Sequence, residues 1–178
     1  MVNALIITGD KVQDHEFIYP YYRLQEEGYQ VDVAVEGGHN VTGYYGTRID
    51  VTCDIPEVSQ YEEWDLLILP GGAKAMEYMR QNLRILNFIA KFHAEDKLIG
   101  VICHGTQLLI SAGNIVEGKL ISGYYSIKDD INNAGGEYLD APYVYDQNIV
   151  SSPHYKYLGP WMKEIIHQTQ LQKLKRGY

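Results

Sequence analysis

The feature that most limits the possible folds of this chain is a regular alternation of short apolar runs with longer segments of helical spacing. Apolar runs without polar alternation are typical of strands that are buried on both faces of a sheet. Strands that alternate with helices indicate a mostly parallel sheet covered by helices on both faces. We expect five such strands, at residues 3–8, 29–35, 64–69, 97–102 and 148–152.

The segments between these strands predict the covering helices. Apolar residues at helical spacing favour helices at residues 14–28, 84–96, 105–113 and 158–174. Gly28 is placed to end the first helix, whereas Pro20 inside it predicts either a kink or a helix that begins near the proline. The glycine-rich, alternating residues 37–55 predict a small β-hairpin excursion, and residues 124–136 are expected to be irregular.

The order of the strands would decide where chemistry can occur. The common arrangement of five such strands has the spatial order 2-1-3-4-5, and its ligands bind beyond the carboxyl ends of the strands. In that order, the turns after the first, third, fourth and fifth strands share one edge of the sheet. These turns contain Asp14 to Glu16, Gly71 and Gly72, Cys103 and His104, and Pro153 and His154.

Composition and charge exclude several classes of function. The 178 residues are expected to form one domain, 1–178, with 46% hydrophobic residues and a formal net charge of −8, which argues against nucleic acid as a partner. No apolar run reaches the roughly 18 residues of a membrane span, and the first residues lack the basic segment of a signal peptide. Two cysteines suit neither a disulfide framework nor a zinc site, so we expect a cytoplasmic protein without a metal or cofactor.

The segment "VICHGTQLL" contains the main candidate for catalysis. Cys103 lies where a strand turns into a helix, the position at which a nucleophile elbow exposes its side chain above a sheet. The amide groups at the start of the following helix would lower the pKa of the thiol. The alternative is a small buried thiol beside a surface histidine, because free cysteine is among the most buried residue types.

Three other turns at the same edge could assist a thiol. Glu16 could accept or supply a proton, although a glutamate in the first turn of a helix is often simply solvated. Backbone amides at Gly71 and Gly72, with that of His104, could form an oxyanion hole, or the glycines could merely end a strand. His154 competes with His104 as the general base, whereas Cys53 is interpreted as structural.

Four ordered motifs, "DHEFIYPYYRLQEEGYQV", "LPGG", "VICHGTQLLISAG" and "IKDDINNAGGE", resemble the ThiJ/PfpI superfamily, and most closely its PfpI-type members, described as intracellular cysteine peptidases. The resemblance implies a flavodoxin-like three-layer sandwich and assembly into homodimers or larger homo-oligomers. It implies the role of nucleophile for Cys103 and that of its acidic partner for Glu16. It also implies that Glu77 approaches the site of a neighbouring subunit and that Tyr124 lies near the site.

Three departures from the family pattern predict a reshaped pocket. Thr106 stands where the family usually has proline after Cys-His-Gly, and Tyr125 replaces the proline of a common Tyr-Pro pair. The stretch after the fifth strand usually contains an arginine and an aspartate, but here it reads "SSPHYKYL", which includes His154, Tyr155 and Tyr157. We therefore expect a more aromatic pocket with a second imidazole, in which Thr106, Tyr124 and Tyr125 contribute to substrate binding.

Three functions remain open from the sequence. The first is a cysteine-dependent enzyme that attacks the electrophilic carbon of a small carbonyl or imidoyl compound, as a hydrolase, hydratase or glyoxalase- or deglycase-like lyase. The second is an oligomeric cysteine peptidase that depends on Glu77, and the third is a non-enzymatic stress chaperone or redox sensor that uses Cys103. A small molecule and further copies of this chain are the expected partners, with no membrane and no nucleic acid.

Overall fold

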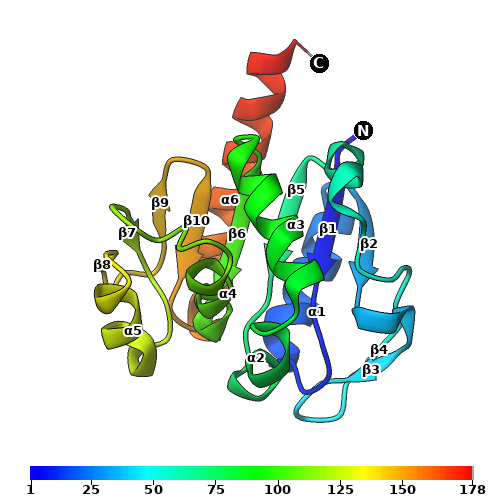
Figure 1. Ribbon diagram of the computed structural model, residues 1–178. Helices are drawn as coiled ribbons and strands as arrows, with labels where there is room; N and C mark the ends of the chain where they lie inside the picture. Colours follow the sequence, from blue (N-terminus) through cyan, green and yellow to red (C-terminus); the bar gives the residue numbers. More distant parts are fainter. Residues whose placement is uncertain (178) are drawn as a thin grey trace.

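A six-stranded sheet forms the centre of the computed structural model, which describes residues 1–177 (Figure 1). Its strand order is β2-β1-β5-β6-β10-β9, and all neighbours pair in parallel except β9, which is antiparallel to β10. The strands span Asn3–Ile7 (β1), Gln30–Ala34 (β2), Leu66–Leu69 (β5), Leu98–Ile102 (β6), Val144–Asp146 (β9) and Ile149–Ser152 (β10). The five predicted strands and their order 2-1-3-4-5 are confirmed, and β9 extends the sheet by one edge strand.

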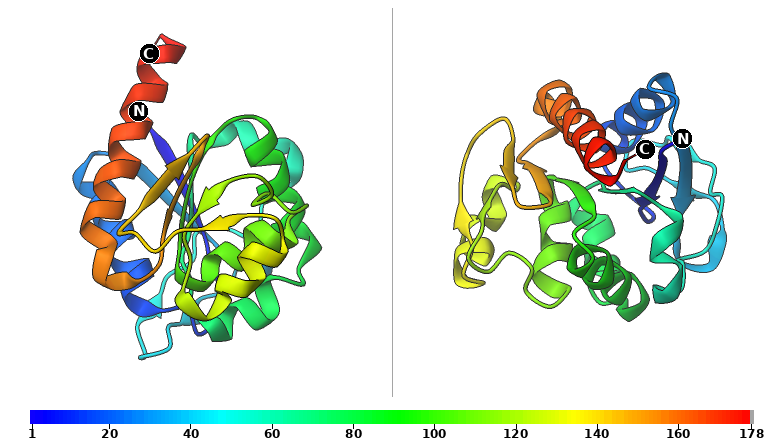
Figure 2. Two further views of the ribbon diagram at one scale, coloured as in Figure 1. Left: turned by 90° about the vertical axis from the view of Figure 1, so that its left-hand side faces the viewer. Right: turned by 90° about the horizontal axis from the view of Figure 1, so that it is seen from above.

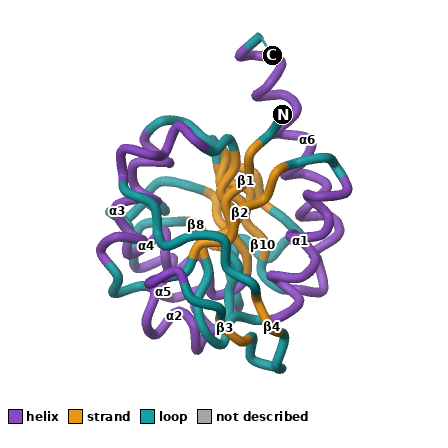
Figure 3. Tube along the Cα trace, turned by 90° about the vertical axis from the view of Figure 1, so that its right-hand side faces the viewer, coloured by secondary structure: helices purple, strands orange, loops and turns teal. Residues whose placement is uncertain are grey.

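Helices cover both faces of the sheet and give the predicted three layers (Figures 2 and 3). One face is covered by α1 (Asp14–Glu26) and α6 (Leu158–Arg176), and the other by α2 (Ala73–Met79), α3 (Leu83–Ala94) and α4 (Thr106–Ser111). Two separate groups of buried apolar side chains fill the spaces between these layers. Burial of apolar side chains on both faces stabilises the sheet.

Two smaller sheets lie outside the three layers. The predicted hairpin excursion is present as antiparallel β3 (Val41–Thr42) and β4 (Arg48–Ile49). The segment expected to be irregular instead contains α5 (Lys128–Asn133), which packs beside the parallel pair β7 (Leu120–Ile121) and β8 (Glu137–Tyr138). Short 3₁₀ turns span Glu36–Gly38, Val58–Glu63, Cys103–Gly105, Tyr125–Ile127 and Tyr155–Tyr157.

The first covering helix continues through its proline. α1 begins at Asp14 and contains Pro20, so the helix does not start near the proline. Gly28 follows the helix with a φ of 76°, the left-handed conformation that ends many helices and that glycine adopts without strain. The start of α1 at Asp14 places Glu16 in its first turn, directly above the carboxyl end of β1.

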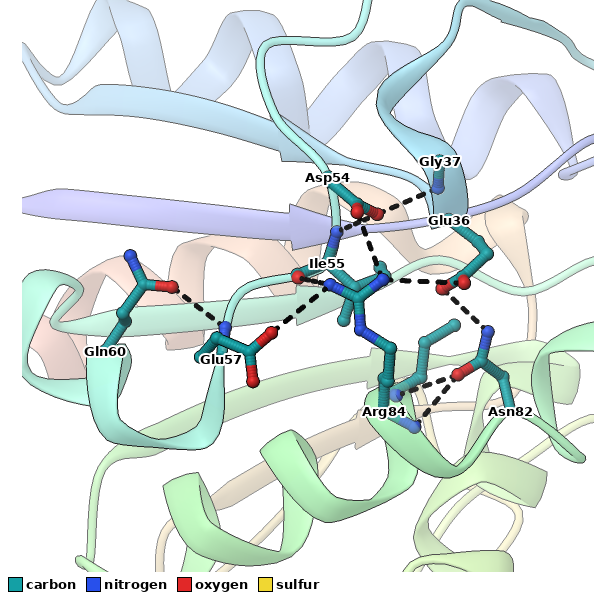
Figure 4. A network of polar contacts seen from close by, with 9 residues as sticks. Glu36, Gly37, Asp54, Ile55, Glu57, Gln60, Asn82 and Arg84 are labelled. Atoms are coloured by element: carbon teal, nitrogen blue, oxygen red, sulfur yellow. Dashed lines mark hydrogen bonds and ion pairs between the residues drawn. The ribbon is translucent and has the colours of Figure 1, made fainter.

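A polar network fastens the excursion to the start of α3 (Figure 4). Arg84 donates to the backbone carbonyl of Ile55 at 2.6 Å and to the carboxylate of Asp54 at 3.0 Å. Asp54 in turn accepts a hydrogen bond from the backbone of Gly37 at 2.8 Å, and Glu36 accepts one from Asn82 at 2.8 Å. Since these charged side chains are half-exposed, we attribute to the network a role in holding the loop rather than a large contribution to stability.

None of the helices within residues 1–177 combines the length and the apolar character that crossing a lipid bilayer would require.

Candidate active site

A pocket of about 440 Å³ lies at the carboxyl ends of the parallel strands, where the turns after β1, β5, β6 and β10 meet. The sequence predicted this convergence from the strand order. The residues that line the pocket are Lys11, Gln13, Glu16, Tyr44, Tyr45, Gly72, Ala73, Lys74, Glu77, Cys103, His104, Tyr124, His154 and Tyr155.

Cys103 lies at a sharp turn between β6 and α4. Its φ is 61°, a left-handed conformation that is uncommon for a residue with a side chain and that often marks a functional site. The turn also needs Gly105, because a Cβ atom there would lie 2.7 Å from the carbonyl oxygen of Leu69. Cys103 as a residue is only 6% exposed, and it is among the residues that line the pocket.

Glu16 is the buried partner of this thiol. Its side chain is fully buried, and its Oε2 accepts a hydrogen bond of 2.7 Å from the backbone N–H of Gly71. The other carboxyl oxygen, Oε1, has no hydrogen-bond partner within residues 1–177. Gly71 leaves room for this arrangement, since a Cβ atom there would lie 2.7 Å from Glu16 Oε2 and 2.9 Å from the Cβ of Cys103. A buried, half-satisfied carboxyl beside a thiol is costly and indicates a proton-transfer role.

Burial raises the pKa values of both groups. The pKa of Glu16 rises from its usual 4.5 to about 8, because burial disfavours the carboxylate more than the amide of Gly71 and the thiol of Cys103 stabilise it. Burial also raises the pKa of Cys103, and an ionised Glu16 would raise it further. The prediction that the thiol has a lowered pKa is therefore wrong. Burial raises the pKa of Cys103 by more than the amides of His104 and Gly72, which face the sulfur, lower it.

The two groups titrate as one pair. Loss of one proton leaves a single negative charge to be shared by sulfur and carboxyl. If that charge lies on sulfur, the N–H groups of His104 and Gly72 stabilise it, and the protonated Glu16 can act as a hydrogen-bond donor. The singly protonated pair is therefore the form in which Cys103 is a nucleophile.

Both candidate imidazoles line the pocket, but they differ in their distance from the thiol. His104 Nδ1 lies 3.4 Å from the sulfur of Cys103, and its ring stacks on Tyr124 with centroids 4.7 Å apart. His154 Nδ1 accepts a hydrogen bond from the backbone of Lys156 at 3.1 Å, and its ring lies 5.9 Å from that of Tyr124. Burial lowers the pKa of both histidines, which favours neutral rings at pH 7.

Three of the residues that were predicted to belong to the site, Gly71, Thr106 and Tyr125, do not line the pocket. Gly71 donates to Glu16 and thus positions the carboxyl, whereas Gly72 lies at the pocket wall. Thr106 is fully buried behind the elbow, where its hydroxyl donates to the carbonyl of Ser122 at 2.9 Å. Tyr125 is 72% exposed, and its ring packs against that of Tyr124 with centroids 4.8 Å apart. Neither Thr106 nor Tyr125 is among the residues that line the pocket, and their contribution to substrate binding stays a prediction.

Several pocket residues were not predicted as site residues. Tyr44 and Tyr45 reach the pocket from the hairpin excursion, which folds back over the start of α1. The carboxylate of Asp14 holds this loop, since it accepts hydrogen bonds from the backbone of Tyr45 at 2.7 Å and of Thr47 at 2.9 Å. The sequence shows an aspartate at the start of α1, but it does not show which residues this aspartate binds. Its partners are more than thirty residues away and follow no local pattern.

The acidic side chain of Glu77 lies at the rim of the same pocket. It pairs with Lys74 at 2.8 Å on the exposed side of α2. Its approach to a neighbouring subunit stays a prediction. Cys53 is half-buried beside β2, away from the pocket. Within residues 1–177, no group of three or more histidine, cysteine, aspartate or glutamate side chains is placed to hold a metal ion.

The sheet order and the strained cysteine turn together define a class, namely α/β proteins with a cysteine at a nucleophile elbow and a buried glutamate beside it. The chain belongs to the DJ-1/PfpI family, whose model matches residues 2–168.

Known relatives and solved structures agree with this assignment. The chain is 41% identical to the deglycase PH1704 of Pyrococcus horikoshii, over 93% of this chain and 98% of that protein. It is 36% identical to the putative cysteine protease YraA of Bacillus subtilis, over 84% of this chain and 86% of that protein. A two-domain protein from Anabaena variabilis with DJ-1/ThiJ/PfpI-like and ferritin-like domains superposes with a TM-score of 0.90 at 29% identity, over 94% of this chain and 48% of that chain.

Proposed function

We propose that this protein is a cysteine-dependent enzyme that hydrolyses or rearranges small electrophilic carbonyl compounds, in the manner of a deglycase. The observation that supports this proposal most strongly is the buried pair of Cys103 and Glu16, whose sulfur faces the amides of His104 and Gly72. The similarity to proteins named deglycases favours one group of substrates, the small 2-oxoaldehydes and their adducts with amines or thiols.

Each step of this chemistry has a group in the pocket. The sulfur of Cys103 forms a bond to the aldehyde carbon, and the protonated Glu16 gives its proton to the carbonyl oxygen, which yields a hemithioacetal and leaves Glu16 as a carboxylate. During this addition the amides of Gly72 and His104 stabilise the negative charge on oxygen, which typically contributes about 3–4 kcal/mol per donor. Glu16 then moves the proton from the hemithioacetal carbon to the adjacent carbon, which leaves a thioester on Cys103. Water hydrolyses the thioester and releases a 2-hydroxy acid and the free thiol.

These reaction steps balance without an external oxidant or reductant. One carbon is oxidised from the aldehyde to the acid level while its neighbour is reduced from a ketone to an alcohol, and one water molecule is consumed. Where the substrate is an adduct, the amine or thiol leaves from the aldehyde carbon as Cys103 takes its place. His104, with Nδ1 at 3.4 Å from the sulfur, is the nearer candidate for the base that activates water.

The pocket favours small substrates over folded or long peptide substrates. Cys103 is almost fully buried in the lining of a pocket of about 440 Å³, which the exposed Tyr44 and Tyr45 also line. A peptidase would have to bind several residues of an extended chain across the scissile bond. Peptidase activity, as in the name of one relative, is therefore treated as the alternative outcome of the experiment.

The proposal is tested by incubating the purified protein with five compounds: a 2-oxoaldehyde, its adduct with an amine, an isonitrile, an amide and an unstructured peptide. We expect a 2-hydroxy acid from the first two, together with a mass increase on Cys103 when the reaction is stopped early. Cleavage of the peptide without turnover of the carbonyl compounds would contradict the proposal. Oxidation of Cys103 without turnover of any compound would instead favour a redox sensor.

A further inference from the structure

The turn between β1 and α1 contains a lysine in a strained conformation. Lys11 has a φ of 62°, and Cys103 has one of 61°. Aspartate and asparagine adopt this conformation comparatively easily, but lysine and cysteine do not. Within residues 1–177, non-glycine residues with positive φ are Lys11, Asp96, Cys103, Asn114 and Gln147. Of these, only Lys11 and Cys103 line the candidate pocket, so the strain at Lys11 indicates a role there.

Contacts from two directions hold the backbone of Lys11 beside the reactive end of the pocket. Its N–H donates to the carbonyl of Thr42 at 2.8 Å, and Tyr44 donates to the carbonyl of Val12 at 2.9 Å. On the other side, a Cβ atom on Gly72 would lie 3.2 Å from the carbonyl oxygen of Lys11. Gly72 contributes one of the amides that face the sulfur, so the lysine side chain starts close to the reacting centre.

Lys11 brings a positive charge to the pocket that no negative charge among its described lining residues compensates. The ammonium of Lys74 is paired with the carboxylate of Glu77 at 2.8 Å. Glu16, with a pKa raised by burial to about 8, is mainly neutral at pH 7. The ammonium of Lys11 is exposed and has no hydrogen-bond or ion-pair partner among residues 1–177. The pocket of an acidic protein, with a net charge of −8, therefore presents a single uncompensated positive charge among these described lining residues.

We propose that Lys11 is an anion-binding residue of this pocket, and that the preferred substrate is a small carbonyl compound with a carboxylate within a few bonds of its electrophilic carbon. The inference rests on the proposed function for the nature of the reaction, but the binding of the anion does not depend on turnover. An ammonium at this place would bind the carboxylate and hold the carbonyl carbon over the sulfur of Cys103. A neutral 2-oxoaldehyde would lack this contact.

The experiment compares the alkylation of Cys103 by iodoacetate and by iodoacetamide, which differ in charge but hardly in size. In both reactions the sulfur forms a bond to the methylene carbon and iodide leaves. Rates are measured by peptide mass mapping, which separates Cys103 from Cys53, in wild type, Lys11→Met, Lys11→Arg and Lys163→Met. Lys163 is an exposed lysine on α6 outside the pocket and serves as the matched control.

We expect Lys11→Met to lower the ratio of the iodoacetate rate to the iodoacetamide rate about tenfold, as for the loss of one charged hydrogen bond. Lys11→Arg should retain most of the ratio, and Lys163→Met should leave it unchanged. A ratio in Lys11→Met equal to that of wild type would overturn the proposal.

A second measurement separates this inference from the proposed function. Turnover is compared for 4,5-dioxopentanoate and 2-oxopentanal, which share the 2-oxoaldehyde group and differ in whether the chain ends in a carboxylate or a methyl group. We expect Lys11→Met to lower kcat/KM for 4,5-dioxopentanoate about tenfold relative to that for 2-oxopentanal. Absence of turnover for every carbonyl compound, combined with a lowered alkylation ratio in Lys11→Met, would reject the proposed reaction while supporting the anion site.

Discussion

Replacing Cys103 by alanine is expected to lower turnover of any carbonyl substrate by at least about a thousandfold, because the variant has no atom that can form the covalent intermediate. The amides of Gly72 and His104 and the carboxyl of Glu16 remain, so substrate binding should persist. Turnover is measured by the appearance of the 2-hydroxy acid. The same measurement on Cys53→Ala provides the matched control, since Cys53 lies outside the pocket.

The fold of the Cys103→Ala variant should be retained. Alanine keeps the Cβ atom at the same strained φ and removes one buried sulfur, for which we expect a loss of about 1 kcal/mol in the free energy of unfolding. Urea unfolding checks this value. Activity that survives in Cys103→Ala but not in Cys53→Ala would contradict the assignment of the nucleophile.

Replacing Glu16 by glutamine is expected to lower turnover by about 10²–10⁴-fold. The glutamine has nearly the same shape, and its oxygen can still accept the hydrogen bond from the backbone of Gly71. It cannot take up or release a proton, however, so the transfer between the two substrate carbons would lose its base. Glu117→Gln, which changes an exposed glutamate outside the pocket, should have wild-type activity.

A comparison of the stability of wild type and Glu16→Gln tests the burial of Glu16. A carboxyl with a pKa of 4.5 when unfolded and about 8 when folded binds its proton more tightly in the folded state. Its contribution to stability is therefore fully present below pH 4.5 and is lost as the pH rises to about 8. The free energy of unfolding of wild type, relative to Glu16→Gln, should fall by up to about 1.4 kcal/mol per pH unit in this range. A constant difference between the two proteins from pH 5 to 8 would show that Glu16 is ionised in the fold.

The central sheet was predictable because its strands are buried on both faces, a condition that leaves a continuous apolar run in the sequence. The edge strand β9 was missed because it has three residues and an exposed Tyr145, which gives no such run. Helix α2 was missed although its seven residues are no fewer than those of α4, which was predicted. A continuous apolar run therefore decided which strands of the central sheet the sequence could predict.

In the site, residues that directly follow a strand were predictable from topology, and residues whose placement depends on distant contacts were not. Glu16, Cys103 and His154 reach one pocket because parallel strands end at the same edge. Tyr45 reaches it only because Asp14 binds the hairpin, a contact across 31 positions. Nothing in the sequence indicated that Thr106 follows the 3₁₀ turn at Cys103–Gly105 with its hydroxyl bound to the carbonyl of Ser122.

The most direct measurement of the central claim, that Cys103 works with a protonated Glu16, is a ¹³C NMR titration of the glutamate side-chain carboxyl carbons. The resonance of Glu16 is assigned by its loss in Glu16→Gln. We expect it to remain that of a protonated carboxyl while the exposed glutamates ionise, and to titrate near pH 8. Titration of Glu16 near its usual value of 4.5 would contradict the account, because at neutral pH the negative charge would then lie on the carboxylate and Cys103 would remain a neutral thiol.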